Sequence, residues 1–409
     1  MPDAPSGRVQ SLDLIRGVAV LGILAINIAG FAGPTASVLT PDYPLPAGDA
    51  DKIAFAVNFV LFEGKMRALF CILFGASLTL FIERMDASGC HGDLLQVRRL
   101  GWLAVFGLLH FYLFWWGDIL FTYALCGVIV LFMRELSRKT LLLTALVIFA
   151  GWHLTGMAMS VPDILAEEHV RTGTASATEQ AQQARYVQLV EDKAEREMAE
   201  YRSGFPDQAL AKLSDRPFHP LTATFDGLGE TLPYMLIGMV LFGSGFFGGS
   251  WPTSRVRALA MGATLAGLVL TLGLLAWAWP RGFPIRAMTA ILIYWTALPH
   301  LLMALGYAAL LVLVAPRFHT TRLGARISAS GRMAFSNYLG TTIVMTAIFY
   351  GWGLGLIGMY GHAAQGLFIL LGWALMLIWS KPWLARYRRG PLEWVWRSLT
   401  ERRMLENRR

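Results

Sequence analysis

The sequence predicts an all-α fold, a polytopic integral membrane bundle of about ten transmembrane helices with both termini in the cytoplasm. Three observations support this prediction. Of the 409 residues, 55% are hydrophobic and 15% are charged, and the mean hydropathy is +0.50, whereas ordinary soluble domains contain about 25% charged residues. About ten apolar runs reach the length of about 20 residues that a bilayer core requires. Basic residues are concentrated in alternate loops between these runs.

The apolar runs give the transmembrane elements in chain order. They cover residues 12–32, 66–83, 99–116, 118–134, 140–160, 228–248, 257–279, 287–314, 333–351 and 363–380. The first run is similar to a signal peptide. Because Asp13 and Arg16 lie within it and no clean cleavage site follows, we expect it to be retained in the mature protein.

The runs divide the chain into four parts. We expect helices 1 to 5 in residues 1–160, an extracytoplasmic insertion in 161–227, helices 6 to 10 in 228–380, and a cytoplasmic interfacial helix with a basic tail in 381–409. In the insertion, Ser176 and Glu179 form a capping-box pattern ahead of an amphipathic helix. We interpret the insertion as a solvated lid or spacer, with a lid that gates a substrate as the alternative. No internal repeat rises above chance.

The net charge of +8 is distributed unevenly along the chain. With a cytoplasmic N-terminus, about twelve basic residues fall in short inner loops and about three in short outer loops. The excess is therefore an orientation signal for a bacterial inner membrane, and the expected partner is the lipid bilayer rather than nucleic acid. Cys71, Cys90 and Cys126 form no CxxC motif, so neither a metal site nor a disulfide framework is expected.

Ionisable and polar groups inside apolar runs are costly, so each is a functional hypothesis. In the first run, Asp13 and Arg16 are three residues apart and can pair on one helix face. Asn27 lies about three turns after Arg16 and returns to that face. The alternative is that Asp13 and Arg16 form only a pair at the helix end.

The stretch 53–83 is too long for one straight span. It contains Glu63-Gly64-Lys65-Met66-Arg67, in which Glu63 and Arg67 are four apart and can pair. A charged break of this kind at membrane depth is tolerated only where it lines a cavity or is buried in protein. The break is therefore either part of a substrate site or a structural elbow.

Two further places combine polar groups with apolar runs. His110 lies near the outer end of the third run, and Asp118 opens the next, so the carboxylate can orient the imidazole as in a base system. A packing histidine is the alternative. At the cytoplasmic start of the ninth run, Arg332 lies close to Asn337 in sequence. Arg332 either binds an anionic cofactor or is only one of the basic residues that orient the protein in the membrane.

Five blocks of sequence together resemble the bacterial YeiB-like family, also called the domain of unknown function 418 family. They are SLDLIRGVAVLGILAIN at 11–27, LFEGKMRALFCILFGASL at 61–78, GLLHFYLFWWGDILFTYAL at 107–125, GRMAFSNYL at 331–339 and RGPLEWVWR at 389–397. The first block also resembles the Leu-Asp-x-x-Arg-Gly opening of membrane acyltransferases of the acyltransferase-3 and heparan-α-glucosaminide acetyltransferase types. That resemblance implies transfer of an acyl group from cytosolic acyl-CoA to an acceptor on the outer side.

Neither acyltransferase family's catalytic histidine is present at its usual place. In acyltransferase-3 enzymes a histidine follows the arginine by eleven positions, and here that position is Asn27. The heparan-type enzyme has its histidine before the second helix, but residues 28–90 contain none. An acyltransferase mechanism therefore requires His110 to take this role.

The favoured expectation is an acyl-CoA- or acetyl-CoA-dependent membrane acyltransferase without a metal. His110 would be the general base, Asp118 would orient it, and Asn27 would hydrogen-bond the acyl carbonyl or oxyanion. Cofactor phosphates would bind Arg16, Arg98, Arg99 or Arg332, and the substrate, a small-molecule, glycan or lipid acceptor, would bind Glu63, Lys65, Arg67 and Asn337.

Two alternatives remain open: a transporter or flippase for an amphipathic or anionic molecule, and a membrane scaffold or sensor. The Gly-rich stretch 238–249 is compatible with packing inside one chain or between the chains of a homodimer.

Overall fold

The computed structural model describes residues 10–409, and its regular structure is helical, with a single isolated β-bridge and no strand in that range. The first half contains α1 (Gln10–Ala32), α2 (Ala36–Leu39), α3 (Asp49–Leu61), α4 (Lys65–Ala87), α5 (Gly92–Leu113), α6 (Leu120–Met133) and α7 (Arg138–Thr172). The middle contains α8 (Ala177–Arg202), α9 (Phe205–Asp215) and α10 (His219–Gly243). The remainder contains α11 (Thr253–Ala278), η1 (Trp279–Arg281), α12 (Ile285–Ala290), the π-helix η2 (Ile291–Trp295), α13 (Ala297–Phe318), α14 (Arg322–Arg332), α15 (Ala334–Phe349), α16 (His362–Arg386) and α17 (Pro391–Glu401).

Each predicted apolar run contains a helix, and the long helices form one bundle. Within residues 10–409, six helices are long and apolar enough to cross a membrane by length and composition. They are Ser11–Ala32, Asp49–Ala87, Arg138–Thr172, Thr253–Arg281, Ala297–Phe318 and His362–Arg386. Shorter apolar helices cover Leu120–Met133, Ile285–Trp295 and Ala334–Phe349. The prediction of a helical membrane protein is confirmed at this level.

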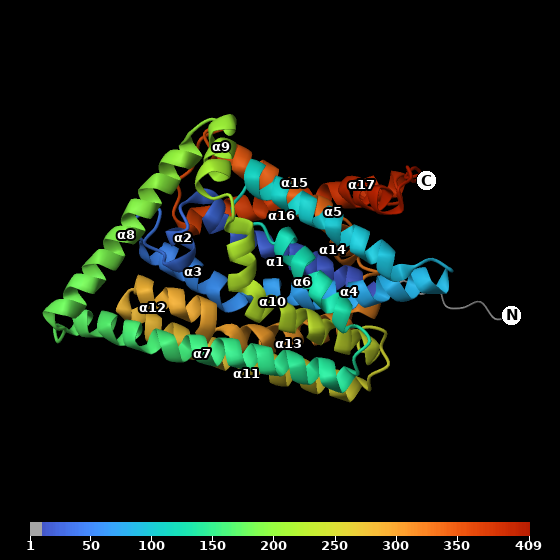
Figure 1. Cartoon of the computed structure of the whole chain (residues 1–409), viewed down its shortest axis with the longest axis horizontal. Helices are drawn as coiled ribbons and strands as arrows, with labels where there is room; N and C mark the ends of the chain where they lie inside the picture. Colours follow the sequence, from blue (N-terminus) through green and yellow to red (C-terminus); the bar gives the residue numbers. More distant parts are fainter. Residues whose placement is uncertain (1–9) are drawn as a thin grey trace.

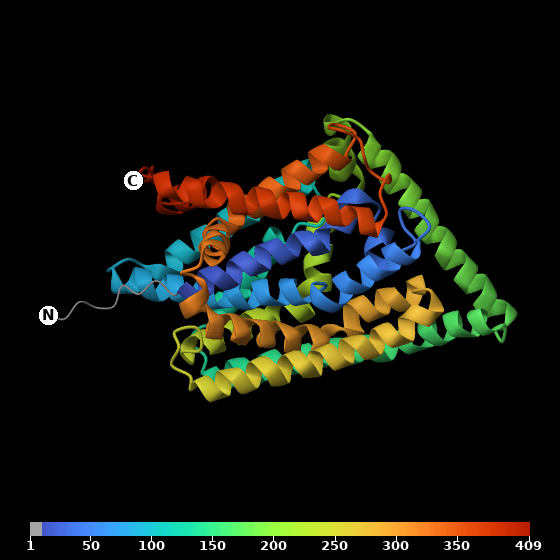
Figure 2. The ribbon, with the colours of Figure 1, turned by 180° about the vertical axis from the view of Figure 1, so that it is seen from behind.

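The bundle has two distinct ends (Figures 1 and 2). The start of α1 and the C-terminal helix α17 lie at one end, here called the α17 end. The helices α8 and α9 of the predicted insertion lie at the opposite end, called the α8 end. The start of α1 and α17 therefore lie opposite the predicted insertion.

At the centre of the bundle, α4 and α10 run in the same chain direction and cross each other. A Cβ built on Gly75 would lie 2.0 Å from the carbonyl oxygen of Met235, and one built on Gly238 would lie 2.0 Å from that of Ile72. Such reciprocal contact of small residues is how membrane helices pack most closely. The helices on the two sides of the crossing are arranged alike. On one side, α6 packs on α10 and α5 packs on α6. On the other side, α13 packs on α4 and α11 packs on α13.

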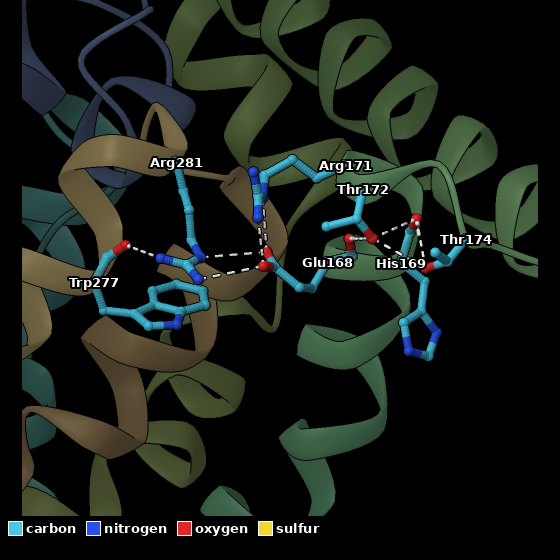
Figure 3. A network of polar contacts seen from close by, with 7 residues as sticks. All are labelled: Glu168, His169, Arg171, Thr172, Thr174, Trp277 and Arg281. Atoms are coloured by element: carbon cyan, nitrogen blue, oxygen red, sulfur yellow. Dashed lines mark hydrogen bonds and ion pairs between the residues drawn. The ribbon is translucent and has the colours of Figure 1, made fainter.

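The insertion is docked on the bundle at both of its ends. At one end, Glu168 near the C-terminus of α7 accepts hydrogen bonds from Arg171 of α7 and from Arg281 of η1, which joins the two elements (Figure 3). At the other end of α8, the Tyr201 ring stacks on Tyr350 with centroids 4.7 Å apart. The predicted Ser176–Glu179 capping box is present at the start of α8. The predicted limits 161–227 fall inside helices, because α7 continues to Thr172 and α10 begins at His219.

Candidate functional site

A histidine–aspartate pair lies at the break between α5 and α6. His110 Nδ1 is 2.8 Å from Asp118 Oδ1, and the two side chains are 1% and 3% exposed. The other carboxylate oxygen of Asp118 accepts the backbone N–H of Phe121 at 2.9 Å and so caps α6. His110 Nε2 is buried and has no hydrogen-bond partner. Because a carboxylate can only accept, Nδ1 carries the proton, and in the neutral imidazole Nε2 then presents a lone pair.

The local sequence explains why this pair forms. Helix α5 ends where the amides of Phe114 and Trp115 both donate to the carbonyl of His110, which turns the chain toward Asp118. Gly107 lies against the start of α6, and a Cβ at this position would lie 2.4 Å from the Phe121 nitrogen. The absence of a side chain at Gly107 therefore lets α6 approach α5 closely enough to bring the pair together.

Next to this pair is a cavity of about 240 Å³. Tyr338 connects the two, because it lines the cavity and its ring centroid lies 5.2 Å from that of His110. The walls are mainly apolar and include Phe70, Leu73, Phe74, Leu103 and Leu120. The cavity therefore has an apolar interior, and Tyr338 rather than His110 is the residue that lines it.

Three of the four arginines predicted to bind a cofactor line the α17 end of this cavity: Arg16, Arg99 and Arg332. Arg16 donates to Ser77 Oγ at 2.5 Å and pairs with Asp13 at 3.4 Å, which confirms the predicted i,i+3 pair. The Arg99 guanidinium lies between aromatic rings, 4.0 Å from the Phe81 centroid and 4.6 Å from that of Trp396. The cavity thus has a basic end and reaches Tyr338, the ring neighbour of His110, whereas His110 and Asp118 themselves do not line it.

Other predicted site residues lie elsewhere. Arg98 does not line the cavity. Asn27 lines a separate small cavity, which shares Tyr338 with the larger one. Asn337 is buried, and its amide donates to the Ser330 carbonyl at 3.0 Å and to Ser380 Oγ at 3.1 Å, so both of its donors are used in joining α14, α15 and α16.

Glu63, Lys65 and Arg67 form a second polar group at the break between α3 and α4. Arg67 pairs with Glu230 of α10 at 2.8 Å rather than with Glu63, so the predicted i,i+4 pair is replaced by one between helices. Lys65 is fully buried, and its Nζ donates to the Phe59 carbonyl at 2.6 Å, at the end of α3. None of the three lines the arginine-containing cavity.

Glu230 and His300 belong to this second group and were not predicted. His300 is 1% exposed, and its Nδ1 lies 4.0 Å from Glu230 Oε1. Glu230 lies within the apolar run 228–248, and His300 lies within the run 287–314. Both could have been found from the sequence, because an ionisable residue inside an apolar run indicates a functional role. Tyr338 and Glu393 of the cavity were also missed, since aromatic and interfacial residues carry no comparable signal.

The fold and site define a helical membrane protein with an internal cavity that is basic at one end and apolar inside. The chain belongs to the YeiB-like family: it is 30% identical to the "Uncharacterized protein YeiB" of Escherichia coli (strain K12), over 97% of each chain. The family profile "Protein of unknown function (DUF418)" matches residues 241–403. The "Uncharacterized protein YxaH" of Bacillus subtilis (strain 168) is 31% identical over 98% of this chain and 96% of its own length. No solved structure matches.

Proposed function

We propose that the protein is an acyltransferase-like protein of the bacterial inner membrane. About ten helices would cross the membrane, with the α17 end in the cytoplasm and α8 and α9 outside. The protein would move an acyl group from cytosolic acyl-CoA or acetyl-CoA to a small-molecule, glycan or lipid acceptor on the outer side. The observation that supports this most is a single cavity with three arginines at one end and Tyr338, in ring contact with His110, at the other.

The cavity suits the acyl-bearing arm of the cofactor rather than the whole molecule. Its volume of about 240 Å³ is below the roughly 300–1,000 Å³ of sites that enclose a complete small-molecule ligand. The apolar walls would hold the acyl group and part of the pantetheine arm. The nucleotide would remain at the α17 end, where Arg16, Arg99 and Arg332 can bind phosphate oxygens through charge-assisted hydrogen bonds.

The proposed chemical step uses the unprotonated Nε2 of His110. Its Nε2 lone pair would take the proton of an acceptor hydroxyl or amine as that group attacks the thioester carbonyl. The buried Asp118 carboxylate would stabilise the imidazolium that forms. Collapse of the tetrahedral intermediate breaks the carbon–sulfur bond, and the imidazolium returns the proton to the departing thiolate. Asn27 would reach the oxyanion only if Tyr338 moves, because Tyr338 lines both cavities.

The test is transfer of radiolabelled acetyl groups. Purified protein in nanodiscs is mixed with labelled acetyl-CoA and fractionated envelope glycans and lipids. Label should move to one acceptor fraction with the wild type and with Arg98→Ala, and not with His110→Ala. Equal transfer by His110→Ala, or no transfer to any fraction, would contradict the proposal.

A second candidate is a transporter or flippase for an amphipathic or anionic molecule. The discontinuous helices α3–α4 and η2–α13 support it, because transporters commonly place substrate sites at broken helices between repeats. Glu63, Lys65 and Arg67 would then contact the solute in a more open conformation, because the cavity that reaches Glu63 is about 10 Å³ here. Uptake or release of a labelled lipid or solute by liposomes containing the protein, without any acyl-CoA requirement, would favour this function.

A further inference from the structure

Six ionisable side chains meet at the break between α3 and α4, and none of them lines the cavity that contains Arg16, Arg99 and Arg332. This elbow cluster consists of Glu63, Lys65, Arg67, His153, Glu230 and His300. They come from the elbow itself and from α4, α7, α10 and α13. The role proposed for the cluster does not depend on acyl transfer.

Several polar atoms of the cluster are buried without hydrogen-bond partners. They include Glu230 Oε1, His300 Nε2 and both ring nitrogens of His153. His153 is 4% exposed and His300 is 1% exposed. Unpaired buried polar atoms are costly and rare in native proteins, so their concentration at one place calls for an explanation.

The backbone around the cluster is irregular on two sides. Gly64 has φ +68°, and a Cβ there would lie 1.9 Å from the His300 ring, so the imidazole can reach the elbow only because the residue is glycine. The π-helix η2 ends immediately before Thr296 and α13, the helix that carries His300. Short π-helical segments frequently occur at functional sites.

The space beside the cluster determines what it can bind. The cavity that reaches Glu63 is about 10 Å³, close to the room that one water molecule needs. No organic solute fits that volume. With Glu63 and Glu230 balanced by Lys65 and Arg67, the formal charge of the group is zero when both imidazoles are neutral. A proton carried in by water is the ligand that requires least space.

We propose that the elbow cluster is a proton-binding site, in which one exchangeable proton is shared among the carboxyl groups of Glu63 and Glu230 and the imidazole of His300. The other titratable groups that face these three are Lys65, Arg67 and Cys71 of α4, His153 of α7 and Tyr234 of α10. Proton binding weakens the Arg67–Glu230 ion pair. Because that pair joins the two helices that cross at Gly75 and Gly238, protonation changes the contact between the two halves of the bundle.

The test is infrared difference spectroscopy of the detergent-solubilised full chain, recorded between about pH 5 and pH 9. The wild type should show a protonated-carboxyl stretching band that appears on acidification. That band should be lost or shifted in Glu63→Gln and Glu230→Gln and unchanged in Glu83→Gln, an exposed position on the same helix α4. A band that neither cluster variant alters would overturn the proposal.

A second measurement follows the wild type and does not depend on the folding of Glu230→Gln, although it needs His300→Asn for assignment. The protein is labelled with ¹⁵N-histidine, and the His300 signals are identified by their loss in His300→Asn. They should shift over the same pH range as the carboxyl band. His300 signals that stay constant across this range would contradict the shared proton. Acyl transfer is measured separately, so failure of one proposal leaves the other open to its own test.

Discussion

His110 Nδ1 lies 2.8 Å from Asp118 Oδ1, and the other imidazole nitrogen is buried without a partner. Asp118 fixes the imidazole tautomer from one side, which leaves Nε2 as a lone-pair acceptor. A packing histidine would normally satisfy both ring nitrogens, and this one satisfies only the nitrogen that orients it.

Replacing Asp118 with asparagine should abolish most transfer activity while preserving the fold. The asparagine carbonyl can still accept the Phe121 amide and cap α6, but its amide group would donate to Nδ1 and place the proton on Nε2. We expect kcat to fall by about 10²- to 10⁴-fold. The thermal midpoint of the variant should remain close to that of the wild type. Wild-type kcat in Asp118→Asn would show that the tautomer does not matter.

Arg99→Ala should weaken binding of acetyl-CoA, and Arg98→Ala should not. Arg99 lines the cavity between Phe81 and Trp396, whereas its neighbour Arg98 is not part of the lining. Loss of a charge-assisted phosphate contact should raise Kd about 10-fold, which corresponds to about 1.4 kcal/mol. Isothermal titration of both variants in nanodiscs compares them directly. Equal losses for Arg98→Ala and Arg99→Ala would indicate only a general effect of surface charge.

Gly75→Ala should destabilise the bundle strongly. A methyl group there would lie 2.0 Å from the Met235 carbonyl oxygen, so α4 and α10 must separate. We expect a loss of roughly 1–3 kcal/mol, as for other overpacked interiors. Gly101→Ala is the matched control, because nothing lies within 4 Å of its added Cβ, and it should be neutral or slightly stabilising. Thermal unfolding in detergent measures both. A wild-type midpoint in Gly75→Ala would show that the crossing is loose.

The insertion should become more stable as the pH rises through the alkaline range. Burial lowers the pKa of Lys212 in α9 from 10.5 to about 8, and its Nζ donates to the Phe114 carbonyl beside the α5–α6 break. Between about pH 8 and 10.5 the unfolded chain binds more protons at this residue than the folded chain, so its contribution to stability increases with pH. Lys212→Met should lack this increase. Thermal midpoints of both proteins across this range test it, and parallel pH profiles would contradict it.

The features that sequence predicted well are those determined within one helix or one turn. The apolar runs became helices because their length and composition match the bilayer. The Asp13–Arg16 pair depends only on i,i+3 spacing. His110 and Asp118 are eight residues apart across a short break, so their proximity was foreseeable.

The features that sequence missed depend on contacts between distant helices. Arg67 and Glu230 are 163 residues apart, and only the parallel crossing of α4 and α10 places them together. This pair replaces the Glu63–Arg67 pair that spacing alone suggested. Arg98 and Arg99 differ by one residue, or about 100° around a helix, and the orientation of α5 decided which of them lines the cavity.

The central claim is that acyl-CoA enters the arginine end of the cavity with its acyl group directed toward His110. Photo-crosslinking with an acyl-CoA analogue that carries a diazirine on the acyl chain, followed by peptide mapping, tests this directly. We expect labelling of Ile119, Leu120, Tyr123 or Tyr338, the cavity residues nearest the α5–α6 break, and loss of labelling when excess CoA is present. Labelling only outside the cavity, or labelling that excess CoA does not reduce, would contradict it.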